Sequence, residues 1–175
     1  MSLQWQLSHE IPEDTAHIGQ LLFAEDNKYR YIGDHFDDLL PDPEIFEPLY
    51  DTQGRGALPP LLCTLVTVFQ FMEKLPDRYA AEQITSRMDW KYACHLPLTY
   101  PGFHFTDLYA FRVRLVEHGQ EQVIFEHVLA KLVALGLVKR KGKARTDSSH
   151  LMGVVQRLTQ LELISECLRA TMKAI

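Results

Sequence analysis

The sequence has few cysteines and no long apolar run. The three cysteines, Cys63, Cys94 and Cys167, lie far apart and in no paired metal-binding spacing, so we expect reduced thiols, no disulfide and no zinc site. No apolar segment approaches the roughly 20 residues that a membrane span needs, and the N-terminus lacks the charged-then-apolar order of a signal peptide. These absences argue against a disulfide-linked secreted scaffold and a membrane partner, and they indicate a cytoplasmic protein.

Charged residues are unevenly distributed along the chain. Residues 1–60 carry three basic and twelve acidic side chains, a balance of −9, whereas residues 61–175 carry fifteen basic and eleven acidic side chains, a balance of +4. With 46% apolar and 23% charged residues, the composition is that of a globular protein. The charge split suggests an acidic leader before a body that can face nucleic acid, although a solvated acidic face is a commoner explanation of one acidic segment.

Apolar residues recur at helical spacing through most of the chain. A buried central helix is predicted from Leu58 to Lys74, with Pro59 and Pro60 in its first turn. Further helices are predicted from the N-caps Asp77 and Thr106 and over residues 120–135. We therefore expect a mainly α fold with helix-turn-helix-like pairs. It comprises a leader of short helices over residues 1–57, a helical DNA-binding-like domain over residues 58–138, and a β-strand and long helix that begin a second domain over residues 139–175.

The helix that starts near Thr106 carries polar side chains beside its apolar stripe. The residues off that stripe that we predict to bind DNA are Thr106, Tyr109, Arg112 and Arg114. Arginine can bind guanine or clamp a phosphate, and short polar groups can fix the register, so a recognition helix needs residues of these types. The alternative is an ordinary amphipathic helix with solvated arginines, which the local sequence by itself favours.

An aromatic cluster of Trp90, Lys91 and Tyr92 precedes that helix. Such a cluster can stack on bases, or it can close the core beneath the loop Pro97–Gly102. The second interpretation is favoured.

A basic run stands directly before one carboxylate. Its cations, which are predicted to grip phosphates, are Lys139, Arg140, Lys141, Lys143 and Arg145. Alternation from Ala144 to Leu151 predicts a strand with Arg145 and Asp147 on one face. Without other support, Asp147 would be expected only to pair with Arg145 or to cap a turn.

The last segment, residues 154–175, has a nearly complete heptad pattern of apolar residues. It can pair with a helix of its own fold or with a partner, which makes a homodimer possible. The pattern has no helix stop signal at its end, so we expect the front part of a longer protein.

Several blocks in this order resemble the InsH-type N-terminal domain of bacterial insertion-sequence transposases. These blocks are Leu75–Glu82, Met88–Ala93, Leu96–Leu98 and Phe111–Leu115. The stretches Arg145–His150 and Leu161–Ala170 resemble the start of the catalytic domain in the same proteins. The similarity extends from about Phe46 to Ile175, and the order of separate blocks makes it specific.

This resemblance implies a cut-and-paste DNA transposase with an RNase H-like core and a catalytic triad of two Asp and one Glu. Its partner would be double-stranded DNA at inverted-repeat ends, and its cofactor Mg²⁺ or Mn²⁺. Asp147 matches the first carboxylate, a metal ligand in a site where two ions about 3.5–4 Å apart activate the attacking oxygen and stabilise the leaving oxygen.

The remaining carboxylates of that triad have no counterpart in this sequence. The acids after Asp147, Glu162 and Glu166, lie close together on the heptad segment, whereas the second and third carboxylates of the family come much later. We therefore expect this chain alone neither to cleave nor to join DNA, and to bind no metal tightly. The alternative function is a helical dimerisation or protein-interaction module without DNA-end recognition.

Overall fold

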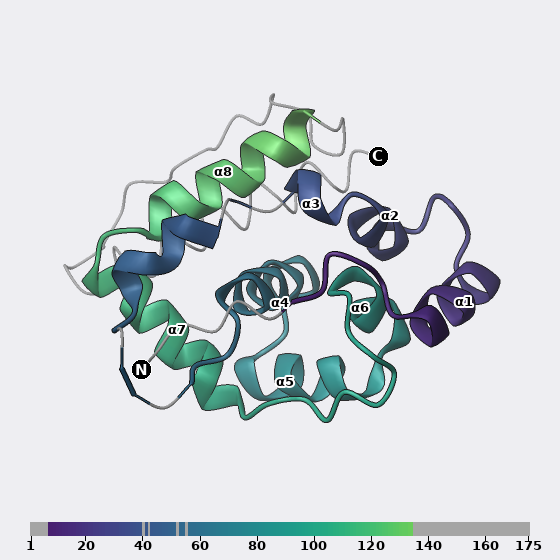
Figure 1. Cartoon of the computed structure of the whole chain (residues 1–175), viewed down its shortest axis with the longest axis horizontal. Coiled ribbons are helices and arrows are strands. Elements are labelled where there is room, and N and C mark those ends of the chain that lie inside the picture. The colour runs from purple at the N-terminus through teal and green to yellow at the C-terminus, as the bar shows by residue number, and fades with distance from the viewer. Residues whose placement is uncertain (1–6, 40, 42, 52, 55, 135–175) are drawn as a thin grey trace.

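The computed structural model describes residues 7–39, 41, 43–51, 53–54 and 56–134, and these residues form a helical body (Figure 1). Its elements are α1 Glu13–Leu22, α2 Lys28–Asp34, α3 Phe36–Leu39, the 3₁₀ helix η1 Pro43–Leu49, α4 Pro60–Glu73, α5 Asp77–Ser86, α6 Met88–Ala93, α7 Phe105–Glu117 and α8 Glu121–Ala134. The mainly α class is confirmed. The predicted strand near residues 144–151 and the predicted helix over 154–175 lie outside the described residues.

Helix α4 is the buried centre of the body, as predicted. Every residue from Pro60 to Gln70 is buried, and Leu62, Val66 and Phe69 have no exposed surface. Helices α5 and α7 pack directly against α4. The helix starts with Pro60 in its first turn and ends where Lys74 takes a left-handed conformation, with φ of 57°. The chain can then reverse into α5 within three residues.

The short helices predicted for the acidic leader are present and share the core of the body. Tyr29, Ile32, Phe36 and Phe46 belong to the same buried cluster as the apolar residues of α4. The apolar packing therefore continues across residue 57. In the part of the chain that the structure describes, no helix is long and apolar enough to cross a membrane.

Two glycines bring α1 and α2 against the ring of Tyr92 on α6. A Cβ atom on Gly19 would lie 2.1 Å from Cδ2 of Tyr92, and one on Gly33 would lie 2.7 Å from Cδ1. The Tyr92 hydroxyl donates a hydrogen bond of 2.6 Å to Asp34. The leader is therefore held by close backbone approach to an aromatic ring, which only glycine permits at these positions.

The cluster of Trp90, Lys91 and Tyr92 closes the core, which confirms the favoured interpretation. All three side chains are buried, and they lie on α6, a helix that the sequence pattern did not predict. The Lys91 ammonium donates a hydrogen bond of 2.5 Å to the carbonyl of Leu98 in the loop above it. Burial lowers the pKa of Lys91.

The two predicted N-caps are wrong. Asp77 is the first residue of α5, its preceding residue Pro76 makes no side-chain cap, and the Asp77 carboxylate binds Gln70 and Arg112 instead. Thr106 is the second residue of α7, whose N-cap is His104. The His104 side chain accepts a hydrogen bond from the Thr106 backbone amide. At α7 the side chain of His104 supplies the cap, and at α5 the Asp77 carboxylate is bound by side chains of other helices instead of capping its own.

We predict that Gly19→Ala destabilises the protein, because the added methyl would overlap the Tyr92 ring. Overpacking of this kind costs about 1–3 kcal/mol, which exceeds the helix-propensity gain of about 1 kcal/mol that alanine brings. Urea unfolding measures the loss. Gln20→Ala, at the exposed neighbouring position of α1, is the control and should unfold like the wild type. A Gly19→Ala protein as stable as the wild type would contradict this packing.

Candidate nucleic-acid interface

On α7, the predicted recognition helix, only some of the residues predicted to bind DNA are exposed. Thr106 is exposed, and Tyr109 is 62% exposed. Arg112 and Arg114 are two residues apart and therefore point about 200° apart around the helix axis. They leave α7 on opposite flanks of the stripe formed by Leu108, Phe111 and Leu115, and each meets a neighbouring element. The structure thus brings Thr106 and Tyr109 together but not the two arginines.

Arg112 lies in a polar cluster that joins three helices. Its guanidinium pairs with the Asp77 carboxylate of α5 and donates a hydrogen bond of 3.1 Å to Oε1 of Gln70 on α4. Nε2 of Gln70 donates in turn to Asp77 at 2.6 Å. The Arg112 side chain is only 13% exposed. The expectation that Arg112 faces solvent is therefore wrong, because the buried Gln70 and the adjacent carboxylate draw the guanidinium inward.

Arg114 lies against Tyr50, the residue that follows η1. Its guanidinium carbon is 4.9 Å from the centre of the Tyr50 ring, and the residue is half-buried. Burial raises the pKa of Tyr50 to about 12, with Arg114 acting in the opposite direction. Arg114 therefore packs on an aromatic ring. Direct DNA contact by Arg112 or Arg114 remains a prediction.

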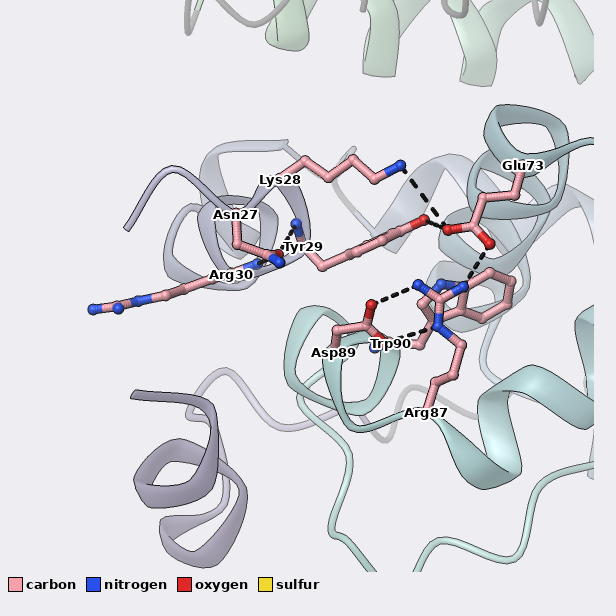
Figure 2. A network of polar contacts seen from close by, with 8 residues as sticks. All are labelled: Asn27, Lys28, Tyr29, Arg30, Glu73, Arg87, Asp89 and Trp90. Carbon is pink, nitrogen blue, oxygen red and sulfur yellow. Dashed lines mark hydrogen bonds and ion pairs between the residues drawn. The ribbon is translucent and has the colours of Figure 1, made fainter. Parts of the chain in front are cut away.

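A second polar cluster surrounds Glu73 at the end of α4 (Figure 2). The Glu73 carboxylate accepts hydrogen bonds from the Tyr29 hydroxyl and, at 2.5 Å, from Arg87, while Lys28 lies 3.9 Å away. Arg87 also donates to both carboxylate oxygens of Asp89, at 2.9 and 2.5 Å. This cluster links α2 and α4 to the segment that enters α6.

The charges in this second cluster stabilise one another. Burial acts to raise the pKa of Glu73, but the hydrogen bonds from Arg87 and Tyr29 and the charges of Arg87 and Lys28 lower the pKa overall. The guanidinium carbon of Arg87 also lies 5.1 Å from the centres of the Tyr29 and Trp90 rings. Arg87 is thus held by carboxylates and aromatic faces together. No sequence pattern had identified this group.

Most basic side chains of the described body are already engaged. Arg30 donates to the carbonyl of Phe23 and pairs with Asp34, in addition to the pairs made by Arg87 and Arg112. By contrast, Lys74 and Arg78 are exposed and make no ion pair with any carboxylate of the described residues. The free cations of the body therefore include a pair at the turn from α4 to α5.

The remaining positive charge lies in the sequence beyond α8. Residues 1–134 carry ten basic and twenty acidic side chains, a balance of −10, and residues 135–175 carry eight basic and three acidic side chains, a balance of +5. The predicted phosphate contacts Lys139, Arg140, Lys141, Lys143 and Arg145, and the predicted metal ligand Asp147, lie outside the described residues. Within the described residues, no group of three His, Cys, Asp or Glu side chains could hold a metal ion.

The fold defines a class of helical domain, in which a central buried helix is surrounded by amphipathic helices and linked to them by two polar clusters. A family model, the Transposase domain (DUF772), matches residues 17–114, from α1 into α7. This stretch is more than half of the chain, and the chain belongs to this family. No curated protein and no solved structure matches the chain.

We predict that Arg112→Ala lowers the free energy of unfolding by about 1–3 kcal/mol, because it removes the cation that pairs with Asp77 and the donor to Oε1 of the buried Gln70. Arg112→Lys should give a smaller loss, since it keeps the charge but not the two-pronged contact. Arg78→Ala, which removes an exposed cation from α5, should change stability by less than about 0.5 kcal/mol. Equal stability of Arg112→Ala and the wild type in urea would show that this cluster is not structural.

We predict a distinct acid response for Glu73→Gln. The pKa of Glu73 is lowered from its ordinary value of 4.5 in the folded state, so its stabilising effect is present above that value and is lost as pH falls through the folded pKa. The variant should be less stable than the wild type at pH 7, and the two should converge in acid.

Unfolding curves recorded from pH 7 to pH 3 measure this convergence. Glu82→Gln, which changes an exposed carboxylate on α5, is the matched control. A constant difference between wild type and Glu73→Gln at every pH would contradict the coupling.

Proposed function

We propose that this chain is the N-terminal portion of a DNA transposase and binds double-stranded DNA at the inverted-repeat ends of its element. Membership of the transposase domain family is the observation that carries the proposal. The exposed polar residues Thr106 and Tyr109 on α7 support it, since a helix that reads a groove presents such side chains. Arg112 and Arg114 then serve mainly to hold α7 in place.

One part of the chain supplies the affinity for DNA, and another part sets the position of the protein along the duplex. Residues 1–134 are net acidic and on their own repel a polyanion, so attraction must come from a local concentration of cations. The run from residue 139 to residue 145 has five basic side chains in seven positions. In this proposal that run grips phosphates, while polar side chains on α7 fix the position of the body along the duplex.

We assign Asp147 as the first metal-binding carboxylate of the full-length enzyme. It follows the basic run by two residues, so phosphates bound by that run would lie beside it. Carboxylate oxygen is the ligand type that Mg²⁺ prefers, and the metal, when bound, would activate the attacking oxygen for phosphodiester cleavage and strand transfer. A single carboxylate does not complete such a site, so this chain alone is proposed to bind DNA without cutting it.

A second candidate function is a helical dimerisation or protein-interaction module. The balance of −10 over residues 1–134 favours it, because an acidic body is poorly suited to non-specific DNA binding. The apolar heptad pattern of residues 154–175 would supply the pairing surface. Such an interface would respond little to salt, whereas phosphate contacts respond strongly.

We predict that the purified chain binds duplexes that carry the inverted-repeat ends more tightly than scrambled duplexes, and that affinity falls steeply with salt. Each neutralised phosphate contributes about −0.9 to the slope of log K against log salt. Replacing all five basic residues between positions 139 and 145 by alanine should therefore reduce that slope by about 4. Fluorescence anisotropy at several salt concentrations measures both quantities.

The scrambled duplex controls for sequence-independent binding in this experiment. Absence of binding at low salt, together with a dimer whose stability is independent of salt, would replace the DNA-binding proposal with the dimerisation module. Binding with an unchanged slope in the five-fold variant would reject the basic run as the phosphate contact.

A further inference from the structure

Arg78, His104 and Phe105 meet where the start of α5 lies beside the start of α7, and Tyr109 lies one helical turn further along α7. The guanidinium carbon of Arg78 is 5.3 Å from the centre of the Phe105 ring, and the His104 ring centre is 4.4 Å from it. Tyr109 follows Phe105 by four residues and therefore lies on the same side of α7. We call these four residues the α5–α7 ridge.

The ridge has exposed side chains that can form ion pairs, hydrogen bonds and aromatic contacts. Arg78 and His104 are exposed, and Tyr109 is 62% exposed although it is a large aromatic residue. The Phe105 face supports the guanidinium of Arg78, which leaves the N–H groups at the edge of the guanidinium open. Because stacking already restricts this guanidinium, it loses less conformational entropy when it binds two phosphate oxygens than an unrestrained guanidinium does.

The ridge and the turn before it carry two cations that no carboxylate of the described residues pairs. At the turn from α4 to α5, the carboxylates of Glu73 and Asp77 are paired with Arg87 and Arg112, whereas Glu82 and Asp107, which also lie close to the ridge in sequence, form none of the ion pairs of the described residues. The negative charge of Glu73 and Asp77 is therefore largely compensated. Arg78 makes no ion pair within the described residues, and neither does Lys74 at the same turn, so both cations are available to an anionic partner.

The other arginines of the body have less freedom to bind a ligand. Arg87 is held between Glu73 and Asp89, and Arg112 is bound to Asp77 and Gln70. Lys91 is buried beneath the loop that contains Leu98. A polyanion that approaches the body would lose existing contacts if it recruited these residues, whereas it loses none by recruiting the exposed side of Arg78.

We propose that the α5–α7 ridge, together with Lys74 at the turn before α5, is the contact of the helical body with duplex DNA, with Arg78 and Lys74 on phosphates and Tyr109 toward the groove. This inference rests on the proposed DNA-binding function and identifies the part of the body that performs it. The Tyr109 hydroxyl can donate a hydrogen bond to a phosphate or to a base edge. Lys74 and Arg78 are both cations at the turn from α4 to α5, and the continuous row of phosphates in duplex DNA offers a partner to each, which favours duplex DNA over an acidic peptide as the occupant.

The test measures DNA affinity of the full-length chain as purified, with Arg78→Ala and Tyr109→Ala compared with the wild type. Arg78→Ala should weaken binding about tenfold and reduce the salt slope by about 1, because one phosphate contact is lost. Tyr109→Ala should weaken binding to the inverted-repeat duplex more than binding to the scrambled one. Both variants should unfold like the wild type, since both side chains are exposed.

Tyr79→Ala is the matched control for Tyr109→Ala. Tyr79 is 56% exposed on α5, directly after Arg78, but it points about 100° away from Arg78 around the helix. It should leave affinity and salt slope unchanged. An equal loss in Tyr79→Ala and Tyr109→Ala would overturn the ridge, because it would indicate a diffuse surface effect.

Failure of the ridge can be distinguished from failure of the proposed function. The ridge would be rejected, with DNA binding left in place, by two results together. Arg78→Ala and Tyr109→Ala would bind DNA with the affinity and salt slope of the wild type, and the variant that lacks the five basic residues of positions 139–145 would show a reduced slope. No binding by the wild type at low salt would reject both.

Discussion

The enclosure of α4 is the constraint on which the rest of this structure depends. Because eleven successive residues of this helix are buried, it must be covered on every side, and its polar groups need partners inside the protein. Gln70 and Glu73, in its last turn, obtain those partners from Arg112 and Arg87. The two resulting clusters set the positions of α5 and α7 and of the segment that enters α6.

This internal use of arginine determines which cations remain for a partner. In an acidic body, the carboxylates near α4 compete for nearby guanidinium groups, and a partly buried pair is held more firmly than an exposed one. The arginines that look best suited to DNA contact in the sequence of α7 are those bound inside. Arg78 and Lys74, at the turn from α4 to α5, are exposed and make no ion pair within the described residues, where Glu73 and Asp77 already have other partners.

The sequence predicted the helices well because periodicity and proline placement are local properties. The burial of α4, its start within two residues of the predicted Leu58, the short leader helices and the packed Trp90 cluster all follow from patterns within about fifteen residues. The inward position of Arg112 was predictable in part: it follows Leu108 by four residues and so borders the apolar stripe. The partner of Arg112 was not predictable, because Asp77 is thirty-five residues away along the chain and was predicted to be an N-cap.

The sequence by itself determined the helical class, the central helix and the transposase resemblance, which the family match to residues 17–114 supports at the level of the family. Tertiary structure alone decided which charged groups neutralise one another and which polar side chains stay exposed. The reason is physical: helix formation depends on neighbours along the chain, whereas the partner of a charge depends on which distant helices come within hydrogen-bond distance. For the same reason, the close approach of Gly19 and Gly33 to Tyr92 could be seen only in the folded chain.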